Sequence, residues 1–281
     1  MAQVVPVFLL AMQSYAWHGG SSEQAVIFWL SVGFAATFGG FVAPALNFVT
    51  APYGRYSGDK MGPISMGVFA TKVNPSIAWV LMECPTLIFA AVLWFGYGDP
   101  QCVTNLPNIL LLLCFVVHYI NRTIIYPMRM NKAASPSNFF VVMSANTFCS
   151  VNGYIQSASL ARHLVVEGGA MFWIGLVIWA VGFYINLDAD DILRKLRKPG
   201  ESGYKIPRGG MFEYVSGANY FGEIVEWLGY AIAMGGELPG LAFAICTVCN
   251  IGPRALSHHK WYLGKFEDYP PQRKALIPFV L

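Results

Sequence analysis

Charge is scarce in this chain of 281 residues. Asp, Glu, Lys and Arg make up 12% of it, whereas 56% of its residues are hydrophobic. A soluble globular domain carries about twice as much charge, so the composition excludes that class of protein. The mean hydropathy of +0.49 instead predicts a polytopic membrane protein. The net charge of +3 is ordinary for such a protein, and we expect no nucleic-acid partner.

Common nucleotide-binding, hydrolase and metal motifs are missing as well. The chain has no GxGxxG, Walker A or GxSxG sequence, so a bound nucleotide would need a site other than a Rossmann fold. It also has no HExxH and no set of HxxxH boxes, and the adjacent His258 and His259 have none of the usual ligand spacings. Cys246 and Cys249 form a CxxC inside an apolar run, which is typical of two small core residues. We therefore expect no metal site.

Long apolar stretches are what the sequence does contain. Seven of them are long enough to cross a hydrocarbon core about 30 Å thick, which predicts an all-α integral membrane protein with seven transmembrane helices. Residues 1–17 are apolar too, but they are short and lack the leading basic residue of a signal peptide, so we expect an interfacial or re-entrant segment there. The seven stretches begin near Ala25, Ser76, Pro107, Ser137, Gly169, Met211 and Pro239.

The distribution of basic residues predicts the orientation. All but two of the 18 Lys and Arg residues fall in the loops after the first, third and fifth stretches or in the C-terminal tail. Cytoplasmic loops carry the excess of Lys and Arg, so we expect the N-terminus outside and the C-terminus in the cytosol. The membrane would be the inner membrane in a bacterium or the endoplasmic reticulum in a eukaryote.

The most polar stretch is residues 186–210, which the charge distribution places in the cytosol. Acids precede bases, and the helical pattern stops at Pro199-Gly200, which predicts a short amphipathic helix and a turn. In one interpretation, solvated pairs four residues apart hold this connector together, Asp190 with Arg194 and Asp191 with Lys195. In the other, three bases share a face that grips phosphates. These bases are Arg194, Arg197 and Lys198.

Two of the predicted spans carry polar groups that are costly in a membrane. Glu83 lies within the second span, where a carboxylate costs about 2.5 to 3.5 kcal/mol on insertion scales. It either makes a helix-to-helix hydrogen bond or serves a site, where burial would favour its protonated, hydrogen-bond-donating form. In the third span, Tyr119, Arg122 and Tyr126 recur at i, i+3 and i+7 and so share one helical face. That face indicates a polar cleft. At its cytosolic end, Arg122 and Tyr126 could instead anchor the helix at the membrane surface.

The sixth predicted span is the least membrane-like, because Glu213, Asn219, Glu223 and Glu226 all lie in it. Asn219, Glu223 and Glu226 share a face at i, i+4 and i+7, which excludes a position against lipid. The two glutamates on this face either neutralise Arg122 and the basic loop or line a ligand site.

Several long motifs carry a resemblance to a known family. The sequence resembles the steroid 5α-reductases throughout the chain beyond residue 50, with its most specific matches in the C-terminal half. The motifs are MEC around Glu83, HYINRTIIYP, NTFCSVNGY, INLDADDILRKLRKPGE, GYKIPRGGMFEYVSGANYFGEIVEWLGYA and HHKWYLGKFEDYPPQRKALIPF.

The resemblance implies an NADPH-dependent membrane enzyme that reduces the 4,5 double bond of a 3-oxo-Δ4-steroid. Glu83 and Tyr119 match the family's acid and tyrosine that polarise the substrate carbonyl. The positions that match the family's cofactor contacts are Tyr53, Asn186, Asp190, Arg197, Tyr204, Asn219, Glu223, Arg254, His258 and Tyr262.

We expect residues 1–281 to form one membrane domain and to act as a monomer. Residues 25–160, with the first four spans, would be the substrate-side half. Residues 169–281, with the last three spans and the loop 186–210, would be the cofactor-side half. The partner would be a steroid or a related lipid enone.

One departure from the family keeps alternatives open. Enzymes of the human type resemble this chain but carry Gln where it has Met82, so a polar group near the steroid carbonyl is missing. A polyprenol or an enoyl thioester is therefore an alternative substrate. Outside this reaction class, a membrane methyltransferase that uses S-adenosylmethionine, or a sterol-binding or transport protein, is the competing interpretation.

Overall fold

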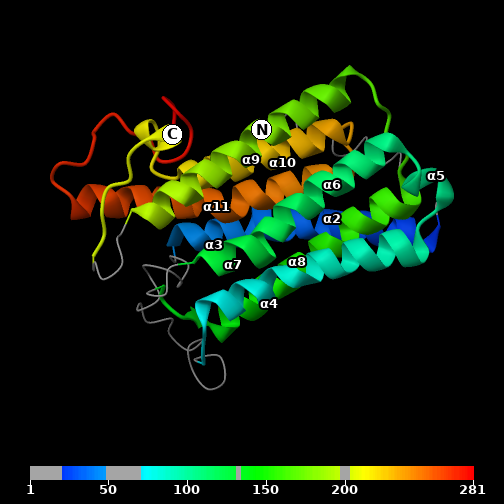
Figure 1. Ribbon diagram of the computed structural model, residues 1–281, viewed down its shortest axis with the longest axis horizontal. Coiled ribbons are helices and arrows are strands. Elements are labelled where there is room, and N and C mark those ends of the chain that lie inside the picture. Colours follow the sequence, from blue (N-terminus) through cyan, green and yellow to red (C-terminus); the bar gives the residue numbers. More distant parts are fainter. Residues whose placement is uncertain (1–20, 49–70, 131–133, 197–202) are drawn as a thin grey trace.

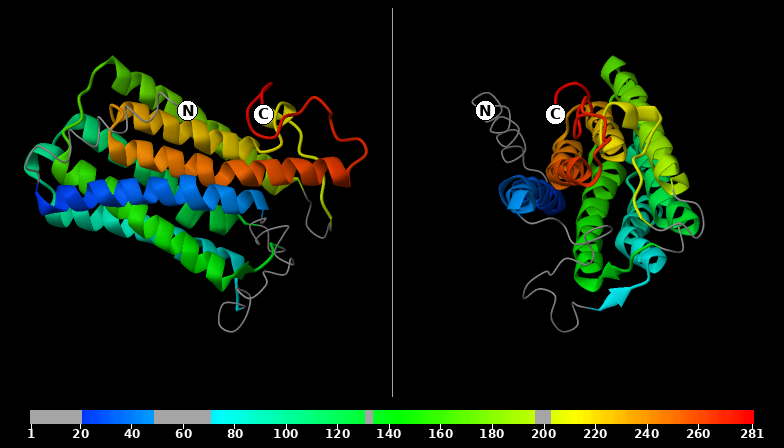
Figure 2. Two further views of the ribbon diagram at one scale, coloured as in Figure 1. Left: turned by 180° about the vertical axis from the view of Figure 1, so that it is seen from behind. Right: turned by 90° about the vertical axis from the view of Figure 1, so that its left-hand side faces the viewer.

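The computed structural model of this protein describes residues 21–48, 71–130, 134–196 and 203–281. Its helices lie side by side in one bundle, in which long helices consecutive in the chain run in opposite directions, and the C-terminal tail folds over the end of the bundle where α9 and α11 finish (Figures 1 and 2). Tyr53 and Arg197, and residues 1–17, lie outside the described residues.

Long helices, several of them continued by a π-helical segment, make up the N-terminal half. Ser22–Thr37 (α2) continues through Phe38–Val42 (η1) into Ala43–Phe48 (α3), and Pro75–Ala91 (α4) continues into Val92–Gly96 (η5). The short Pro100–Val103 (α5) precedes Leu106–Ile120 (α6), which runs through Asn121–Ile125 (η6) into Tyr126–Arg129 (α7). Phe139–Ala158 (α8) ends in Ser159–His163 (η7). Two short strands, Lys72–Val73 (β1) and Ser137–Asn138 (β2), pair antiparallel.

The C-terminal half begins with Ala170–Lys195 (α9), followed by the 3₁₀ turn Gly210–Glu213 (η8), Ala218–Ala233 (α10) and Leu238–Lys265 (α11). Residues 186–195, predicted as a separate short helix, are the last turns of α9. The sixth predicted span is also too long, because α10 begins at Ala218 and not near Met211. Met211, Phe212 and Val215 pack in an apolar cluster with the end of α9, so residues 210–217 are apolar for a reason other than contact with lipid.

Asn side chains fix the start of several helices. The side-chain oxygen of Asn74 accepts from the backbone N–H of Ser76 at 3.0 Å, and those of Asn105 and Asn138 cap α6 and α8 in the same way. Each satisfies a donor that the first turn of a helix leaves without an intrahelical partner.

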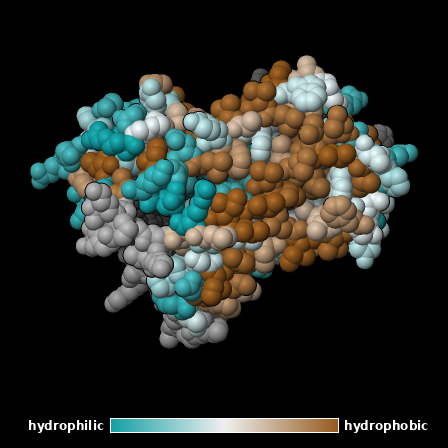
Figure 3. Space-filling model, in the orientation of Figure 1, coloured by the Kyte–Doolittle hydropathy of each residue, from teal (hydrophilic) through white to brown (hydrophobic). Residues whose placement is uncertain are grey.

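Five of the described helices are long and apolar enough to cross a membrane: 22–48, 75–96, 106–129, 170–195 and 238–265. Their outward side chains form a broad hydrophobic surface, whereas hydrophilic residues gather at the end that carries the C-terminal tail (Figure 3). An all-α, multi-pass membrane protein is thereby confirmed.

Glycine brings α9 and α10 into backbone contact. A Cβ added at Gly182 would collide with the backbone of Glu226, and one added at Gly229 with the backbone of Trp179. Gly175 and Gly222 make equivalent contacts seven residues away on their respective helices. Small residues at such spacing let helices approach closely within a membrane, and here they set side chains of α9 directly against α10.

Candidate active site

Glu83 lies in the middle of α4, where it faces α8. Pro85 has no N–H, so the carbonyl of Leu81 loses its helical donor, and the side chain of Asn146 donates to that carbonyl at 2.7 Å. This bond ties α4 to α8 beside Glu83. The thiol of Cys149, one turn further along α8, donates to Oε2 of Glu83 at 3.2 Å. Glu83 thus makes the helix-to-helix hydrogen bond that was one of the two predictions for it.

Tyr119 reaches the same helix from α6. Its side chain is buried, and its hydroxyl oxygen lies 3.4 Å from the donating Nδ2 of Asn152. Cys149 and Asn152 are three residues apart on α8, so Glu83 and Tyr119 contact neighbouring positions on one face of that helix. The structure therefore brings the two predicted carbonyl-polarising residues to a common place.

Arg122 organises a second group of polar side chains. Its two terminal nitrogens lie 3.2 Å from Oδ2 of Asp190 and 3.1 Å from Oε1 of Glu223, and its guanidinium lies 4.6 Å from the centre of the Trp79 ring. The side chains of Arg122 and both acids are 12 to 14% exposed. Their partners hold the charges where water has little access, because buried charges require pairing.

This arrangement corrects one predicted ion pair and confirms another. Asp190 pairs with Arg122, 68 residues away, and not with Arg194. Arg194 and Lys195 both pair with Asp191, so the predicted Asp191–Lys195 pair is confirmed. Asp190 is thereby part of the buried group and not of a solvated connector.

Asn186 joins α9 to α10 in the same group. Its Nδ2 donates to the backbone oxygen of Asn219 at 3.1 Å and lies 3.4 Å from Oε1 of Glu223. The contact is possible because Gly222 lets the backbones of the two helices meet at Asn186. Oδ1 of Asn186 is buried and has no hydrogen-bond partner among the described residues, so it can accept a hydrogen bond from a donor outside them.

Glu226 lies on the same face of α10 as Glu223, as predicted, and both glutamates meet the α6–η6 helix, at His118 and Arg122 respectively. It is completely buried, and its Oε1 lies 2.7 Å from Nδ1 of His118. The side chain of His118 is only 5% exposed, and its ring packs on Trp227 with centroids 4.6 Å apart. The pair therefore joins α6 to α10 in the core, beside Tyr119. Glu223 alone of these two glutamates meets Arg122.

Arg254, His258 and Tyr262 recur every four residues along α11 and share a face. The ring of His258 lies 5.6 Å from that of Tyr220, the neighbour of Asn219 on α10. Tyr262 stacks on Tyr269 of the C-terminal tail at 5.2 Å. His258 of α11 thus packs on α10 at the residue that follows Asn219.

Tyr204 lies further along the same end of the bundle. Its ring packs edge-on against Trp261 with centroids 4.9 Å apart, which brings it to the C-terminal part of α11, next to Tyr262 in the sequence. Tyr204 is 40% exposed, so it remains open to a ligand from outside the bundle.

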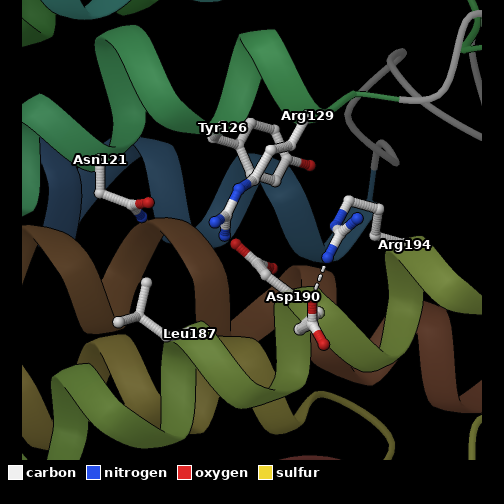
Figure 4. Close-up of a pocket in the computed structure, with 7 residues that line it drawn as sticks. Asn121, Tyr126, Arg129, Leu187, Asp190 and Arg194 are labelled. Atoms are coloured by element: carbon white, nitrogen blue, oxygen red, sulfur yellow. Dashed lines mark hydrogen bonds and ion pairs between the residues drawn. The ribbon is translucent and has the colours of Figure 1, made fainter.

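A small cavity of about 40 Å³ opens between α7 and α9 beside the Arg122 group. Arg129 and Asp190 turn toward one another across it, and Arg194 lies at its edge (Figure 4). This volume holds one or two water molecules and is far smaller than an organic ligand. The lining residues are Asn121, Tyr126, Arg129, Leu187, Asp190, Asp191 and Arg194.

Glu213, predicted inside the sixth span, lies in the 3₁₀ turn η8 outside the membrane-spanning helices. The backbone N–H of Gly209 donates to its Oε1 at 2.6 Å, and a terminal nitrogen of Arg273 lies 3.5 Å from its Oε2. The Gly209 N–H, with a smaller contribution from Arg273, lowers the pKa of Glu213 below its ordinary value. Arg273 is itself buried and donates to the carbonyl of Pro207 at 2.8 Å. The tail thereby holds the segment before α10 in place.

The family of the chain follows from its similarity to known proteins. A sequence profile described as 3-oxo-5-alpha-steroid 4-dehydrogenase matches residues 135–281. The chain belongs to the 3-oxo-5-alpha-steroid 4-dehydrogenase family. The predicted family is confirmed, and this member is accordingly an oxidoreductase.

Similar relatives of this family member come from animals and plants. It is 46% identical over 243 residues to mouse 3-oxo-5-alpha-steroid 4-dehydrogenase 1, an alignment that covers 84% of this chain and 90% of the relative. It is 45% identical over 213 residues to the human protein of that name, covering 74% and 81%. It is 42% identical over 249 residues to steroid 5-alpha-reductase DET2 of Arabidopsis thaliana, covering 85% and 90%.

Three polar residues of α8 belong to the candidate site but were not predicted. Cys149, Asn152 and Gln156 lie at i, i+3 and i+7, so three polar side chains share one face of a predicted span. The same spacing argument that singled out Tyr119 and Arg122 could have found them. Among the described residues, no group of three or more His, Cys, Asp or Glu side chains could hold a metal ion.

Proposed function

We propose that this protein reduces the 4,5 double bond of 3-oxo-Δ4-steroids to 5α-dihydrosteroids with NADPH. The observation that carries the proposal is the meeting of Glu83 and Tyr119 on one face of α8, because two hydrogen-bond donors at one place suit a ketone oxygen. The names of the animal and plant relatives agree with this substrate class.

In the proposed mechanism, a protonated Glu83 and the hydroxyl of Tyr119 donate hydrogen bonds to the C3 oxygen of the enone. These bonds draw electrons from the C4–C5 double bond toward the oxygen, which leaves C5 electron-poor. A hydride then adds at C5, and C4 takes a proton, so that one hydride and one proton complete the reduction. A preorganised donor of this kind is typically worth about 10² to 10³ in rate.

When bound, NADPH supplies the hydride, and a donor set on α9, α10 and α11 suits it. The buried Oδ1 of Asn186 would accept from an amide or hydroxyl of the cofactor. The side chains that would hold NADPH are Asn186, Asp190, Tyr204, Asn219, Glu223, Arg254, His258 and Tyr262, with Tyr53 and Arg197 from outside the described residues.

We further propose seven transmembrane helices, with α8 and α10 added to the five identified by length and composition. α8 is polar, but Asn152, Gln156 and Ser157 are buried, so the bundle and not the lipid surrounds them. The N-terminus would lie outside and the C-terminus in the cytosol. Residues 25–160 would form the substrate-side half and residues 169–281 the cofactor-side half of a monomer. The endoplasmic reticulum in a eukaryote, or the inner membrane in a bacterium, would hold it.

Met82, at the position where enzymes of the human type have Gln, leaves a second substrate class open. Its side chain is buried in an apolar cluster with Ala78 and Val142, so it offers no polar group next to Glu83. A polyprenol or an enoyl thioester is therefore the alternative substrate for the same chemistry. Membership of an oxidoreductase family disfavours the methyltransferase and transport interpretations.

The test is NADPH oxidation by the detergent-purified protein with and without testosterone or progesterone, with the product identified by mass spectrometry. We expect steroid-dependent oxidation that yields the 5α-dihydro product. Binding of NADPH without reduction of either steroid would move the search to polyprenols and enoyl thioesters. Absence of NADPH binding would contradict the proposed function.

A further inference from the structure

A chain of hydrogen bonds runs from the start of α11 through α8 to Tyr119. Nε2 of Gln156 donates to the carbonyl of Pro239 at 2.9 Å and to Oδ1 of Asn152 at 3.2 Å. Nδ2 of Asn152 in turn lies 3.4 Å from the hydroxyl oxygen of Tyr119. Asn152 and Gln156 are no more than 1% exposed and Tyr119 is 3% exposed, so water does not compete for these bonds.

The carbonyl of Pro239 fixes the direction of the whole chain. A carbonyl oxygen can accept a hydrogen bond but cannot donate one, so the amide nitrogen of Gln156 must be the atom that faces Pro239. The second N–H of the same nitrogen then faces Asn152, which must present its oxygen. The remaining end of the Asn152 amide, which faces Tyr119, is therefore a donor.

This direction decides what the Tyr119 hydroxyl can do. Because its oxygen accepts from Asn152, its own proton is directed away from α8. Cys149, one turn earlier, donates its thiol proton to Oε2 of Glu83, so the acid proton of Glu83 is directed to the other oxygen. One face of α8 thus donates a hydrogen bond to Glu83 and another to Tyr119. The carboxyl proton of Glu83 and the hydroxyl proton of Tyr119 are then both available to a ligand.

We propose that Asn152 and Gln156 are positioning residues that hold Tyr119 as a hydrogen-bond donor toward the substrate carbonyl. The inference rests on the proposed reduction of a steroid enone and adds to it a role for α8. If the Asn152 amide turned over, its oxygen would accept the Tyr119 proton, and the carbonyl would lose that donor. Gln156 prevents this turn because an inverted Asn152 would set two donors against each other.

The test is a double-mutant cycle in steroid turnover. Asn152→Leu keeps the approximate volume of the side chain but removes its donor, and we expect it to lower kcat about tenfold, the worth of one oriented neutral hydrogen bond. In a Tyr119→Phe background, the same substitution should have no further effect, because the hydroxyl through which it acts is absent. A role in packing alone would lower kcat equally in both backgrounds.

Gln156→Met provides a second route if Asn152→Leu fails to accumulate. It leaves Asn152 in place but frees its amide to turn, so kcat should fall with Tyr119 present and should not change in Tyr119→Phe. The matched control is Ser159→Ala, at the first residue of η7, which removes a buried hydroxyl that donates to the carbonyl of Ile155 one turn earlier. Its turnover should equal that of the wild type.

Three measurements separate the outcomes. NADPH binding, followed by fluorescence, should be unchanged in every variant. If the wild type forms the 5α-dihydrosteroid but the effects of Asn152→Leu and Tyr119→Phe on ln kcat simply add, the positioning role is wrong and the proposed function stands. If the wild type forms no dihydrosteroid, the proposed function is wrong, and the positioning role, which is stated for a steroid carbonyl, is wrong with it.

Discussion

Asn146 of α8 donates a hydrogen bond to the backbone carbonyl of Leu81 on α4, the carbonyl that Pro85 deprives of its helical donor. The interruption and its repair lie within one turn of Glu83. Pro85 thus leaves the Leu81 carbonyl free to accept a hydrogen bond from α8. This bond joins the two helices close to Glu83.

Loss of the Asn146 side chain should therefore destabilise the protein. Asn146→Ala leaves the Leu81 carbonyl without this exposed hydrogen bond, which costs about 0.5 to 1.5 kcal/mol, measured by thermal unfolding in detergent. In a Pro85→Ala background the helix supplies its own N–H, so the same substitution should cost much less. Equal losses in both backgrounds would contradict this account of the contact.

Glu83→Gln and Tyr119→Phe should each lower turnover about 10² to 10³. Tyr119→Phe removes one of the two donors to the proposed carbonyl, and Glu83→Gln replaces the acidic O–H of the other with a far less acidic amide N–H. Both leave the Arg122 group intact, so the dissociation constant for NADPH should change little. Steady-state kinetics and fluorescence titration measure the two quantities. A near-normal rate in Glu83→Gln would show that the acid is not needed.

Arg122→Met should be strongly destabilising. The substitution leaves Asp190 and Glu223 as neighbouring, largely buried acids without their cation, and breaking such a pair costs about 3 to 5 kcal/mol. Thermal unfolding in detergent measures it. The matched control, Arg194→Ala, removes an exposed ion pair with Asp191, which is worth at most about 1 kcal/mol.

Arg197→Ala should weaken the preference for NADPH over NADH, if this residue recognises the additional 2′-phosphate through bidentate contact. The measured quantity is the ratio of kcat/KM for the two cofactors. Lys198→Ala, at the adjacent base, is the matched comparison. An unchanged ratio in Arg197→Ala would contradict a phosphate role.

The segment before α10 should loosen in acid. The pKa of Glu213 is lowered in the folded protein, so its ionised form stabilises this segment fully above the ordinary pKa of 4.5. This contribution is lost as the pH falls through the lower pKa of the folded state. Proteolysis of residues 203–217, followed from pH 7 toward pH 3, should accelerate at the acid end. Glu213→Gln should reduce that dependence.

Much of the helical framework could be predicted from the sequence. Pro75, Leu106, Phe139, Ala170 and Leu238 begin helices within two residues of the predicted starts, because apolar runs and Asn or Pro at their beginnings are local signals. The start of α10 could not be predicted in this way. Met211 and Phe212 look like membrane residues in the sequence but pack against α9 and its neighbours.

The sequence indicated which residues belong to the candidate site, but it did not indicate which of their side chains contact one another. Glu83 was singled out because a carboxylate is unusual within an apolar span, and Tyr119 because it shares a helical face with Arg122. Their proposed role at a carbonyl came from the family resemblance. The partner of Asp190 was misjudged because Arg194 lies four residues away, whereas Arg122 approaches only through the packing of α6 and α9. The spacing of Asn152 and Gln156 could have revealed their shared face, but the bond of Gln156 to the carbonyl of Pro239, 83 residues away, could not be predicted.

The glycine contacts between α9 and α10 have a consequence for biosynthesis. α10 is only 16 residues long and carries Glu223 and Glu226, so it is poorly suited to enter lipid alone. α9 precedes it and presents Gly175 and Gly182 as a face that fits the α10 backbone. We expect the two helices to leave the translocon together as a hairpin, with the acids of α10 already shielded by α9.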